Sequence, residues 1–181
     1  SDLENKLINS IKKLLNKNSN INYKLLSEIL TIPSFSDLES SLNNIDPHKI
    51  YKISNDLYSK FGGELKIELY EKLNEIEKNI YQKWPKGNNE RKLIEVIWKL
   101  LLHSNDLGIR QSLINYIDSN NMTLSKSVLN VFIGHKCIER SIVSNKFFNK
   151  WNDNSIVLDS WFYFAASLEE NNSLEQLENL F

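Results

Sequence analysis

Apolar residues recur at intervals of three and four along almost the whole chain, which is the spacing of one face of an α-helix. The first segment carries the pattern in Leu3, Leu7, Ile8, Ile11, Leu14 and Leu15. The positions between them include Lys6, Lys12, Lys13 and Lys17. This alternation predicts an amphipathic helix that places one stripe in a core and its lysines in water.

The same spacing predicts helices in the rest of the chain. In the first half the expected helices span 23–31, a short stretch from 36, 47–61 and 65–84. The last of these is long, and its apolar face ends at Trp84. In the second half they are 90–103, 106–118, 124–134, 137–152 and 156–169, with a stub over 174–180. Short connections between them favour antiparallel hairpins of successive helices.

Several helix ends are marked by residues with a local preference. Asp46 followed by Pro47 predicts a side-chain cap and a first helical residue. Gly62-Gly63 is expected to end that helix, and Ser36 to Glu39 has the form of a capping box. Pro85-Lys86-Gly87 should break the following helix, which predicts a hinge at 85–89.

The chain has five glycines and three prolines, which is too few turn-forming residues for a β-rich fold. The predicted fold class is therefore all-α, with stacked antiparallel helical hairpins that form a HEAT-like or armadillo-like superhelix. Residues 1–181 are expected to form a single all-helical domain or a fragment of one, because this length is enough to bury a core.

Composition excludes some classes of partner. Twenty-two basic and 23 acidic residues give a formal charge of −1, and no run of Lys and Arg could neutralise several phosphates, so no nucleic-acid binding is expected. No apolar run is long enough to span a membrane. The single cysteine, Cys137, suits a reducing, cytoplasmic compartment, and its helical context predicts a buried or half-buried thiol rather than a nucleophile.

Catalytic chemistry is not visible in the chain. His48, His103 and His135 are far apart in sequence and lack the His-Glu-x-x-His spacing of zinc peptidases. Each is expected at a helix end or on the surface, with an imidazolium modestly favoured at the helix C-termini near His103 and His135. The four consecutive aromatic residues from Trp161 to Phe164 could line a peptide groove, but interior packing between helices is favoured.

Several short stretches, in order and at the right spacing, resemble a known family. They are Ile29–Ser34, Ile45-Asp46-Pro47, Glu90–Leu93, Asn120–Thr123, Phe148–Trp151 and Val157–Phe162. The chain is similar to the helical C-terminal region of aminopeptidase N, the zinc alanyl aminopeptidases of the gluzincin type. The residues that carry the resemblance are Pro33, Asp46, Pro47, Arg91, Asn121, Met122, Thr123, Trp151, Asp159, Trp161 and Phe162. Ser160 departs from the family, which usually has Lys there.

The resemblance implies a role rather than a reaction. The family removes N-terminal residues from peptides with a zinc ion, and its metal-binding and catalytic motifs lie in a preceding domain that this chain does not contain. No catalytic or metal residue can therefore be carried onto this sequence, and Thr123 and Trp161-Phe162 are interpreted as capping and packing residues. The expected partner is the catalytic domain of the same polypeptide, which the helical region covers to enclose the active-site cavity.

Two other interpretations remain open. The chain could be an independent helical-repeat scaffold that binds a peptide or protein in its groove, whereas a stand-alone enzyme with a new site has little support. Leu177, Leu180 and Phe181 form an apolar edge, so self-association of the fragment is also expected.

Overall fold

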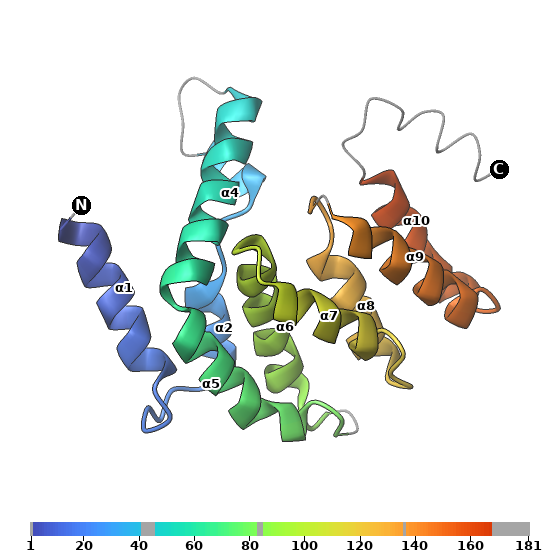
Figure 1. The fold of residues 1–181 in the computed structure, drawn as a ribbon, viewed down its shortest axis with the longest axis horizontal. Helices are drawn as coiled ribbons and strands as arrows, with labels where there is room; N and C mark the ends of the chain where they lie inside the picture. The colour runs from blue at the N-terminus through green and yellow to red at the C-terminus, as the bar shows by residue number, and fades with distance from the viewer. Residues whose placement is uncertain (1, 41–45, 83–84, 136, 168–181) are drawn as a thin grey trace. The chain divides into compact units, whose positions relative to one another are not determined.

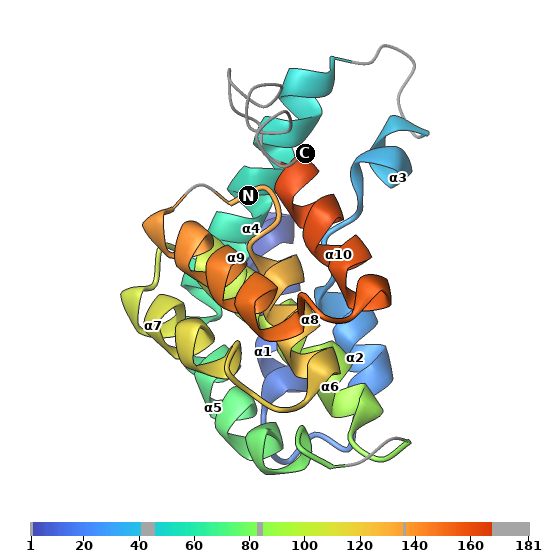
Figure 2. The same cartoon turned by 90° about the vertical axis from the view of Figure 1, so that its right-hand side faces the viewer.

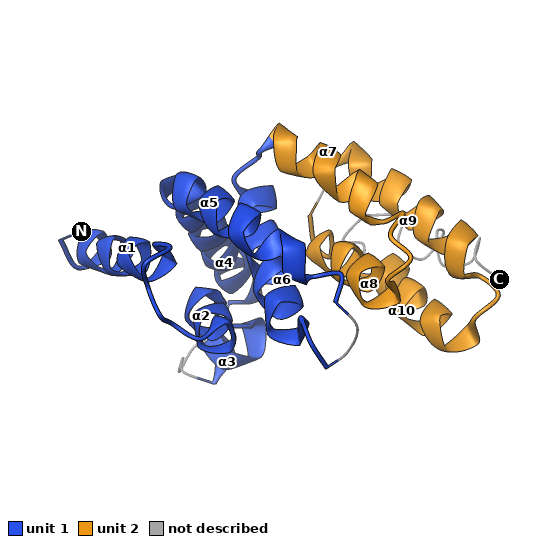
Figure 3. Ribbon diagram, turned by 90° about the horizontal axis from the view of Figure 1, so that it is seen from below, with its two compact units in different colours: residues 1–106 blue, residues 107–181 orange. Residues whose placement is uncertain are grey.

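The computed structural model describes residues 2–40, 46–82, 85–135 and 137–167, and these residues form helices without a strand (Figure 1). The predicted all-α class is confirmed. The chain divides into two compact units, residues 1–106 and 107–181 (Figure 3). The predicted hinge at 85–89 lies inside the first unit and stays a prediction, and the predicted stub at 174–180 lies outside the described residues.

The first unit contains six α-helices and one short 3₁₀ helix among its described residues. They are α1 (Asp2–Leu15), α2 (Tyr23–Leu30), α3 (Phe35–Glu39), α4 (Pro47–Glu64), α5 (Lys66–Ile76), η1 (Glu77–Asn79) and α6 (Asn88–His103). Helix α6 is the centre of this unit, since α2, α4 and α5 all pack against it. Leu93, Ile97 and Leu101 are fully buried. Lys92 and Lys99, two turns apart, lie on a side that is not buried. The helix is therefore amphipathic, and its neighbours cover its broad apolar face.

The second unit contains α7 (Leu107–Tyr116), α8 (Met122–Val131), α9 (Ile138–Trp151) and α10 (Ser155–Ala166). Each helix packs against the next one in the chain, and α10 also contacts α8. Figure 2 shows α9 and α10 side by side. Val128, Phe132, Val143 and Phe147 are fully buried and form the core of this unit.

The fifth predicted helix is shorter than predicted. Helix α5 ends at Ile76 and continues as the 3₁₀ turn η1, whereas the prediction extended it to Trp84, which lies outside the described residues. The turn that follows η1 is bound by Arg91 of α6. Its Nη1 donates hydrogen bonds to the carbonyl oxygens of Ile80 at 3.0 Å and Gln82 at 2.9 Å. Carbonyls that bind a guanidinium in this way do not need the amides of a following helical turn.

The Gly62-Gly63 pair does not end a helix, because α4 continues through it to Glu64. Gly62 is buried where α4 crosses the backbone of α6 at Leu100. The pair was wrongly predicted as a terminator because a glycine that ends a helix and a glycine that permits a close crossing look alike in sequence.

Two further starts were misplaced by a few residues. The capping box of α3 is formed by Ser34 and Asp37 rather than by Ser36 and Glu39. The Asp37 carboxylate accepts from the Ser34 amide at 2.9 Å, and the Asp37 amide donates to the Ser34 hydroxyl at 3.3 Å. Helix α8 begins at Met122 after the cap Asn121, so Thr123 lies within its first turn and does not start it.

Candidate functional site

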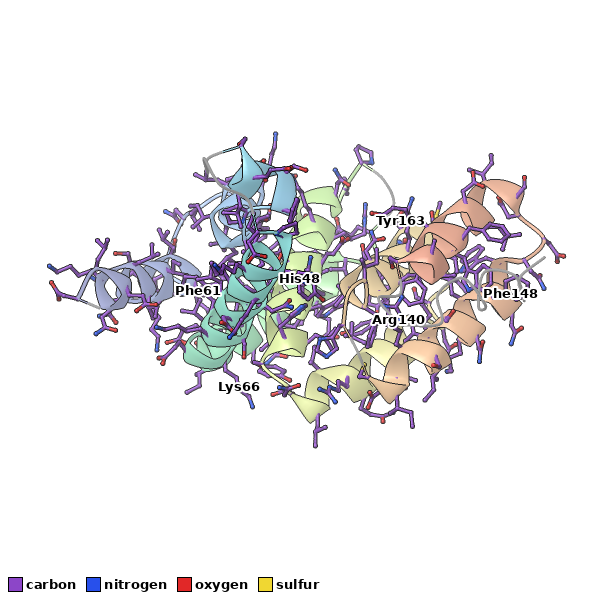
Figure 4. All side chains as sticks on the ribbon, turned by 90° about the horizontal axis from the view of Figure 1, so that it is seen from above. His48, Phe61, Lys66, Arg140, Phe148 and Tyr163 are labelled. Atoms are coloured by element: carbon purple, nitrogen blue, oxygen red, sulfur yellow. The ribbon has the colours of Figure 1, made fainter. Side chains whose placement is uncertain are left out.

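An apolar groove lies between α1 and α4 in the first unit, and we call it the α1–α4 groove. Leu7 and Ile11 of α1 form one wall, and Leu57 and Phe61 of α4 form the opposite wall. Figure 4 shows Phe61 between the ribbons of the two helices. The groove encloses about 330 Å³.

The end of α2 completes the lining of the groove. Helix α2 stops before Ile32-Pro33, where the residue before proline is driven out of helical backbone. Thr31 is extended at φ −72° and ψ 120°, which carries Ile32 and Pro33 along the groove. The buried side chains of Leu65 and Leu100 contribute to the same lining. Pro33, one of the residues of the family resemblance, therefore has a place in this groove.

Two ion pairs attach α1 to the helices beside it. Lys60 of α4 lies 2.5 Å from a carboxylate oxygen of Glu4, and Lys12 lies 3.3 Å from Glu68 of α5. The hydrogen bond from Lys60 is the main cause that lowers the pKa of Glu4 to about 2. Glu4 is thus ionised at neutral pH and its charge is balanced at the edge of the groove.

A polar cluster joins α2 to α5. Lys72 is almost fully buried, and its ammonium donates to Glu75 Oε2 at 2.8 Å, while the Tyr23 hydroxyl donates to Glu75 Oε1 at 2.8 Å. Burial acts to raise the pKa of Glu75, but the hydrogen bonds from Lys72 and Tyr23 prevail and lower it. Burial, together with the carboxylate, raises the pKa of Tyr23 to about 12. The cluster is a neutralised structural contact rather than a proton-transfer site.

A second polar cluster surrounds Asp106, whose side chain is only 6% exposed. The Tyr70 hydroxyl donates to Asp106 Oδ1 at 2.8 Å, and Lys66 lies 2.6 Å from Oδ2. Burial is the main cause that raises the pKa of Tyr70, and Asp106 adds to it. Both oxygens of the buried carboxylate are therefore engaged by α5.

Arg140 of α9 holds the second unit together. Its guanidinium donates to the carbonyl oxygens of Phe132 at 3.2 Å and Phe164 at 2.9 Å, and it lies 4.3 Å from the centre of the Phe164 ring. One buried cation thus satisfies carbonyls at the ends of α8 and α10. Nothing in the sequence around Arg140 separates it from an exposed arginine, and sequence analysis missed it.

The residues of the family resemblance occupy structural positions in the first unit. Asp46 caps α4 as predicted, since its carboxylate accepts from the amides of His48 at 3.1 Å and Lys49 at 3.4 Å, and Pro47 is the first helical residue. Arg91 is buried, and besides Ile80 and Gln82 it binds the carbonyl oxygen of Lys86 at 3.2 Å. These side chains organise turns, and the structure does not bring them into one site.

In the second unit, the resemblance residues divide between caps and packing. The Asn121 side chain accepts from the Leu124 amide at 3.2 Å, whereas Met122, Thr123 and Asp159 are exposed. Trp161 is buried and donates from Nε1 to the Ser144 hydroxyl at 3.0 Å. Its ring packs at a tilt against Phe148, with 4.7 Å between the ring centres. Trp151 is half-buried.

The four consecutive aromatic residues are not all interior. Trp161 and Phe164 are buried, but Phe162 is 38% and Tyr163 68% exposed, so the expectation of interior packing was wrong for Tyr163. Phe162 packs edge-on against Trp161, with 5.3 Å between ring centres. Figure 4 labels Tyr163 on α10. On a helix buried on one side only, consecutive residues cannot all face the core.

The histidines do not form a metal site. His103 Nδ1 lies 2.9 Å from the carbonyl oxygen of Lys99, and the ring centres of His103 and Tyr58 are 4.7 Å apart. Burial lowers the pKa of His103. The expectation of an imidazolium at this helix end was wrong, because burial disfavours the charged ring. His48 is exposed near the start of α4. Within the part of the chain that the structure describes, no group of three His, Cys, Asp or Glu could hold a metal ion.

Cys137 is half-buried, as predicted. It stands in extended backbone immediately before α9, whereas the predicted helix began at this residue. Burial raises the pKa of its thiol, and Glu139 adds to the effect.

Across the described helices, none combines the length and apolar character needed to cross a membrane.

Comparisons with known proteins give a consistent result. Aminopeptidase N of Escherichia coli is 26% identical over 160 residues, which is 86% of this chain and 18% of that protein. Aminopeptidase N of Haemophilus influenzae is 26% identical over 157 residues, or 87% of this chain and 18% of that protein. The chain thus spans about a fifth of the length of these relatives.

The fold also matches a solved structure. The crystal structure of Legionella pneumophila aminopeptidase A in complex with aspartic acid superposes with a TM-score of 0.79 and 21% sequence identity, over 96% of this chain and 21% of that one. The predicted resemblance to the helical C-terminal region of aminopeptidase N is confirmed. A family model described as a domain of unknown function with ARM repeats matches residues 1–181, and the chain belongs to this family, DUF3458_C.

Proposed function

We propose that this chain is the first part of the helical C-terminal domain of a zinc aminopeptidase that removes N-terminal residues from peptides. In this proposal the chain covers the catalytic domain of the same polypeptide and helps to enclose its active-site cavity, without chemistry of its own. The observation that carries the proposal is the similarity to two aminopeptidases N along most of the chain, which covers only 18% of each of them.

The fold suits such a role. Stacked helices of the ARM type expose broad surfaces, and these proteins use those surfaces to bind partners. An enclosed active site also excludes water from the reaction. The apolar α1–α4 groove provides one place on the first unit where another part of the polypeptide can pack.

Among the described residues, no group of His, Cys, Asp or Glu could hold a zinc ion. The half-buried carboxylate of Glu75 and the buried carboxylate of Asp106 are each engaged by a lysine and a tyrosine. The proposal therefore assigns the zinc ion and every catalytic residue to the part of the protein outside this chain. It also assigns the protein to the cytoplasm, which a single half-buried cysteine in 181 residues supports.

The test begins with the complete reading frame that encodes these residues. We expect a His-Glu-x-x-His motif in it, upstream of the segment. The whole protein should hydrolyse an alanyl arylamide and hold stoichiometric zinc, while the purified 181-residue chain should do neither. Hydrolysis by the isolated chain that a chelator abolishes would contradict the proposal. A reading frame limited to this segment would favour the independent scaffold instead.

A further inference from the structure

The lining of the α1–α4 groove and the surface beside it expose large apolar side chains. Leu7 on α1 is 49% exposed, and Ile29 on α2 is 41% exposed. On α4, Ile53 is 53% exposed and lies one turn before Leu57, so it extends the apolar row beyond the groove. Apolar surface left in water costs about 25 cal/mol for each Å², and gathered apolar patches commonly mark interaction sites.

The chemistry of the lining favours a protein segment over a small molecule. Small-molecule sites of this size contain a few free polar groups that orient the ligand. Among the described residues that line the groove, Thr31 and Glu4 have polar side chains, and both are engaged. The Thr31 hydroxyl donates to the Ser27 carbonyl at 2.7 Å, and Glu4 is paired with Lys60. An occupant must therefore satisfy its own backbone polar groups, as a helix does.

The shape of the groove also suits a helix. Two helices, α1 and α4, form its walls, and the buried side chains of Leu30, Leu65 and Leu100 contribute to its lining. Grooves of this kind take the apolar face of an amphipathic helix, with anchors at positions i, i+3 or i+4, and i+7. The 330 Å³ inside accommodates a small number of large apolar anchors.

The small area of the groove indicates that the helix comes from the same polypeptide rather than from a separate protein. A groove bounded by a few side chains buries much less than the roughly 1,200 Å² of total surface that a stable complex of free partners needs. A segment of the same polypeptide avoids this requirement, because covalent linkage gives it an effective concentration in the millimolar range. The similarity to relatives about five times longer supplies a reason to expect such a segment.

We propose that the α1–α4 groove binds the apolar face of an amphipathic helix that the same polypeptide supplies from outside residues 1–181. This inference rests on the proposed function, because it requires a longer protein. It adds to that function a docking site, formed by Leu7, Ile29 and Phe61. It also names the segment that binds there as an amphipathic helix.

Protection of single cysteines tests the proposal. Leu7→Cys and Ile29→Cys place a thiol on two helices of the groove lining, α1 and α2. Ile67→Cys, at a position of α5 that is 73% exposed and outside the lining, is the matched control. Each is combined with Cys137→Ser in the whole protein. The rate of N-ethylmaleimide modification is then measured at each position by peptide mass spectrometry.

Exposure alone predicts similar rates at the three positions. We expect modification at positions 7 and 29 of the whole protein to be at least ten-fold slower than at position 67. Rates at 7 and 29 that are close to the rate at 67 would overturn the proposal. Slow modification at 7 and 29 that becomes faster on dilution of the whole protein would assign the groove to a second copy and would also overturn it. Hydrolysis of the alanyl arylamide is measured separately, so a folded whole protein that protects the groove without hydrolysis contradicts only the aminopeptidase assignment.

Discussion

Gly62 of α4 approaches the carbonyl of Leu100 on α6 so closely that a β-carbon at position 62 would stand 2.0 Å from that oxygen. No rotamer change can relieve this contact, because the obstacle is backbone. The two helices pack at their present distance only if residue 62 has no side chain.

Gly62→Ala should therefore destabilise the protein by about 3 kcal/mol, as expected for overpacking at a rigid contact. Gly63→Ala is the matched control, because its added methyl meets nothing within 4 Å. Replacing a helical glycine there should stabilise by about 0.5 kcal/mol. Urea unfolding of the two variants measures both effects, and similar midpoints for them would show that the crossing tolerates a methyl.

Arg140→Leu should lower the free energy of unfolding by about 3 kcal/mol. The substitution leaves the carbonyls of Phe132 and Phe164 without their charged donor in the core of the second unit. Lys146→Leu provides the control, because it removes a partly exposed pair with Asp118 that is worth less than about 0.5 kcal/mol. Chemical denaturation of both variants checks the difference, and an equal loss in both would contradict an anchoring role for Arg140.

His103, which is half-buried, should make stability depend on pH in the mildly acidic range. Burial lowers its pKa in the folded protein below the ordinary value of 6.5, so the unfolded chain binds more protons there. Its contribution is complete above pH 6.5 and is lost as the pH falls through the folded pKa. His103→Gln should flatten the dependence of the unfolding free energy between pH 7 and about pH 5, while His48→Gln, at an exposed position, should keep it. Parallel curves for His103→Gln and the unmodified protein would contradict this assignment.

Cys137 should react slowly with alkylating reagents in the folded protein. Burial raises the pKa of the thiol above the ordinary value of 9, and the thiolate is the reactive form. We expect the rate with iodoacetamide at pH 8 to increase when the chain is unfolded in urea. Glu139→Gln should increase the rate in the folded state to a smaller extent, because it removes the nearby carboxylate that also raises the pKa. A native rate equal to that of the unfolded chain would contradict the prediction.

The sequence predicted features that depend on neighbours along the chain. The helical class follows from apolar spacing, and the start of α4 follows from Asp46 and Pro47, whose preferences act within one turn. The segment after η1 was predicted wrongly as helix, and its Ile80 carbonyl is bound by Arg91, eleven residues further along the chain. The role of Gly62 likewise depends on Leu100 of another helix.

The α1–α4 groove could not be predicted for the same reason. Its lining comes from segments separated by dozens of residues, such as Leu7, Ile29 and Phe61. Apolar spacing shows that each of these residues belongs to an amphipathic helix, but not that a neighbouring helix leaves it exposed. The resemblance to a family was detected because order and spacing along the chain were sufficient for it.

The ion pairs of α1 have a consequence for how the first unit opens. Lys12–Glu68 and Lys60–Glu4 are partly exposed, and dissolved salt screens such pairs much more than it affects buried apolar contacts. Local unfolding of α1 should therefore become easier as ionic strength rises, while α6 is unaffected. Amide hydrogen exchange should then become faster in α1 before it does in the other helices. Since α1 is one wall of the groove, the opening of that wall should depend on salt concentration.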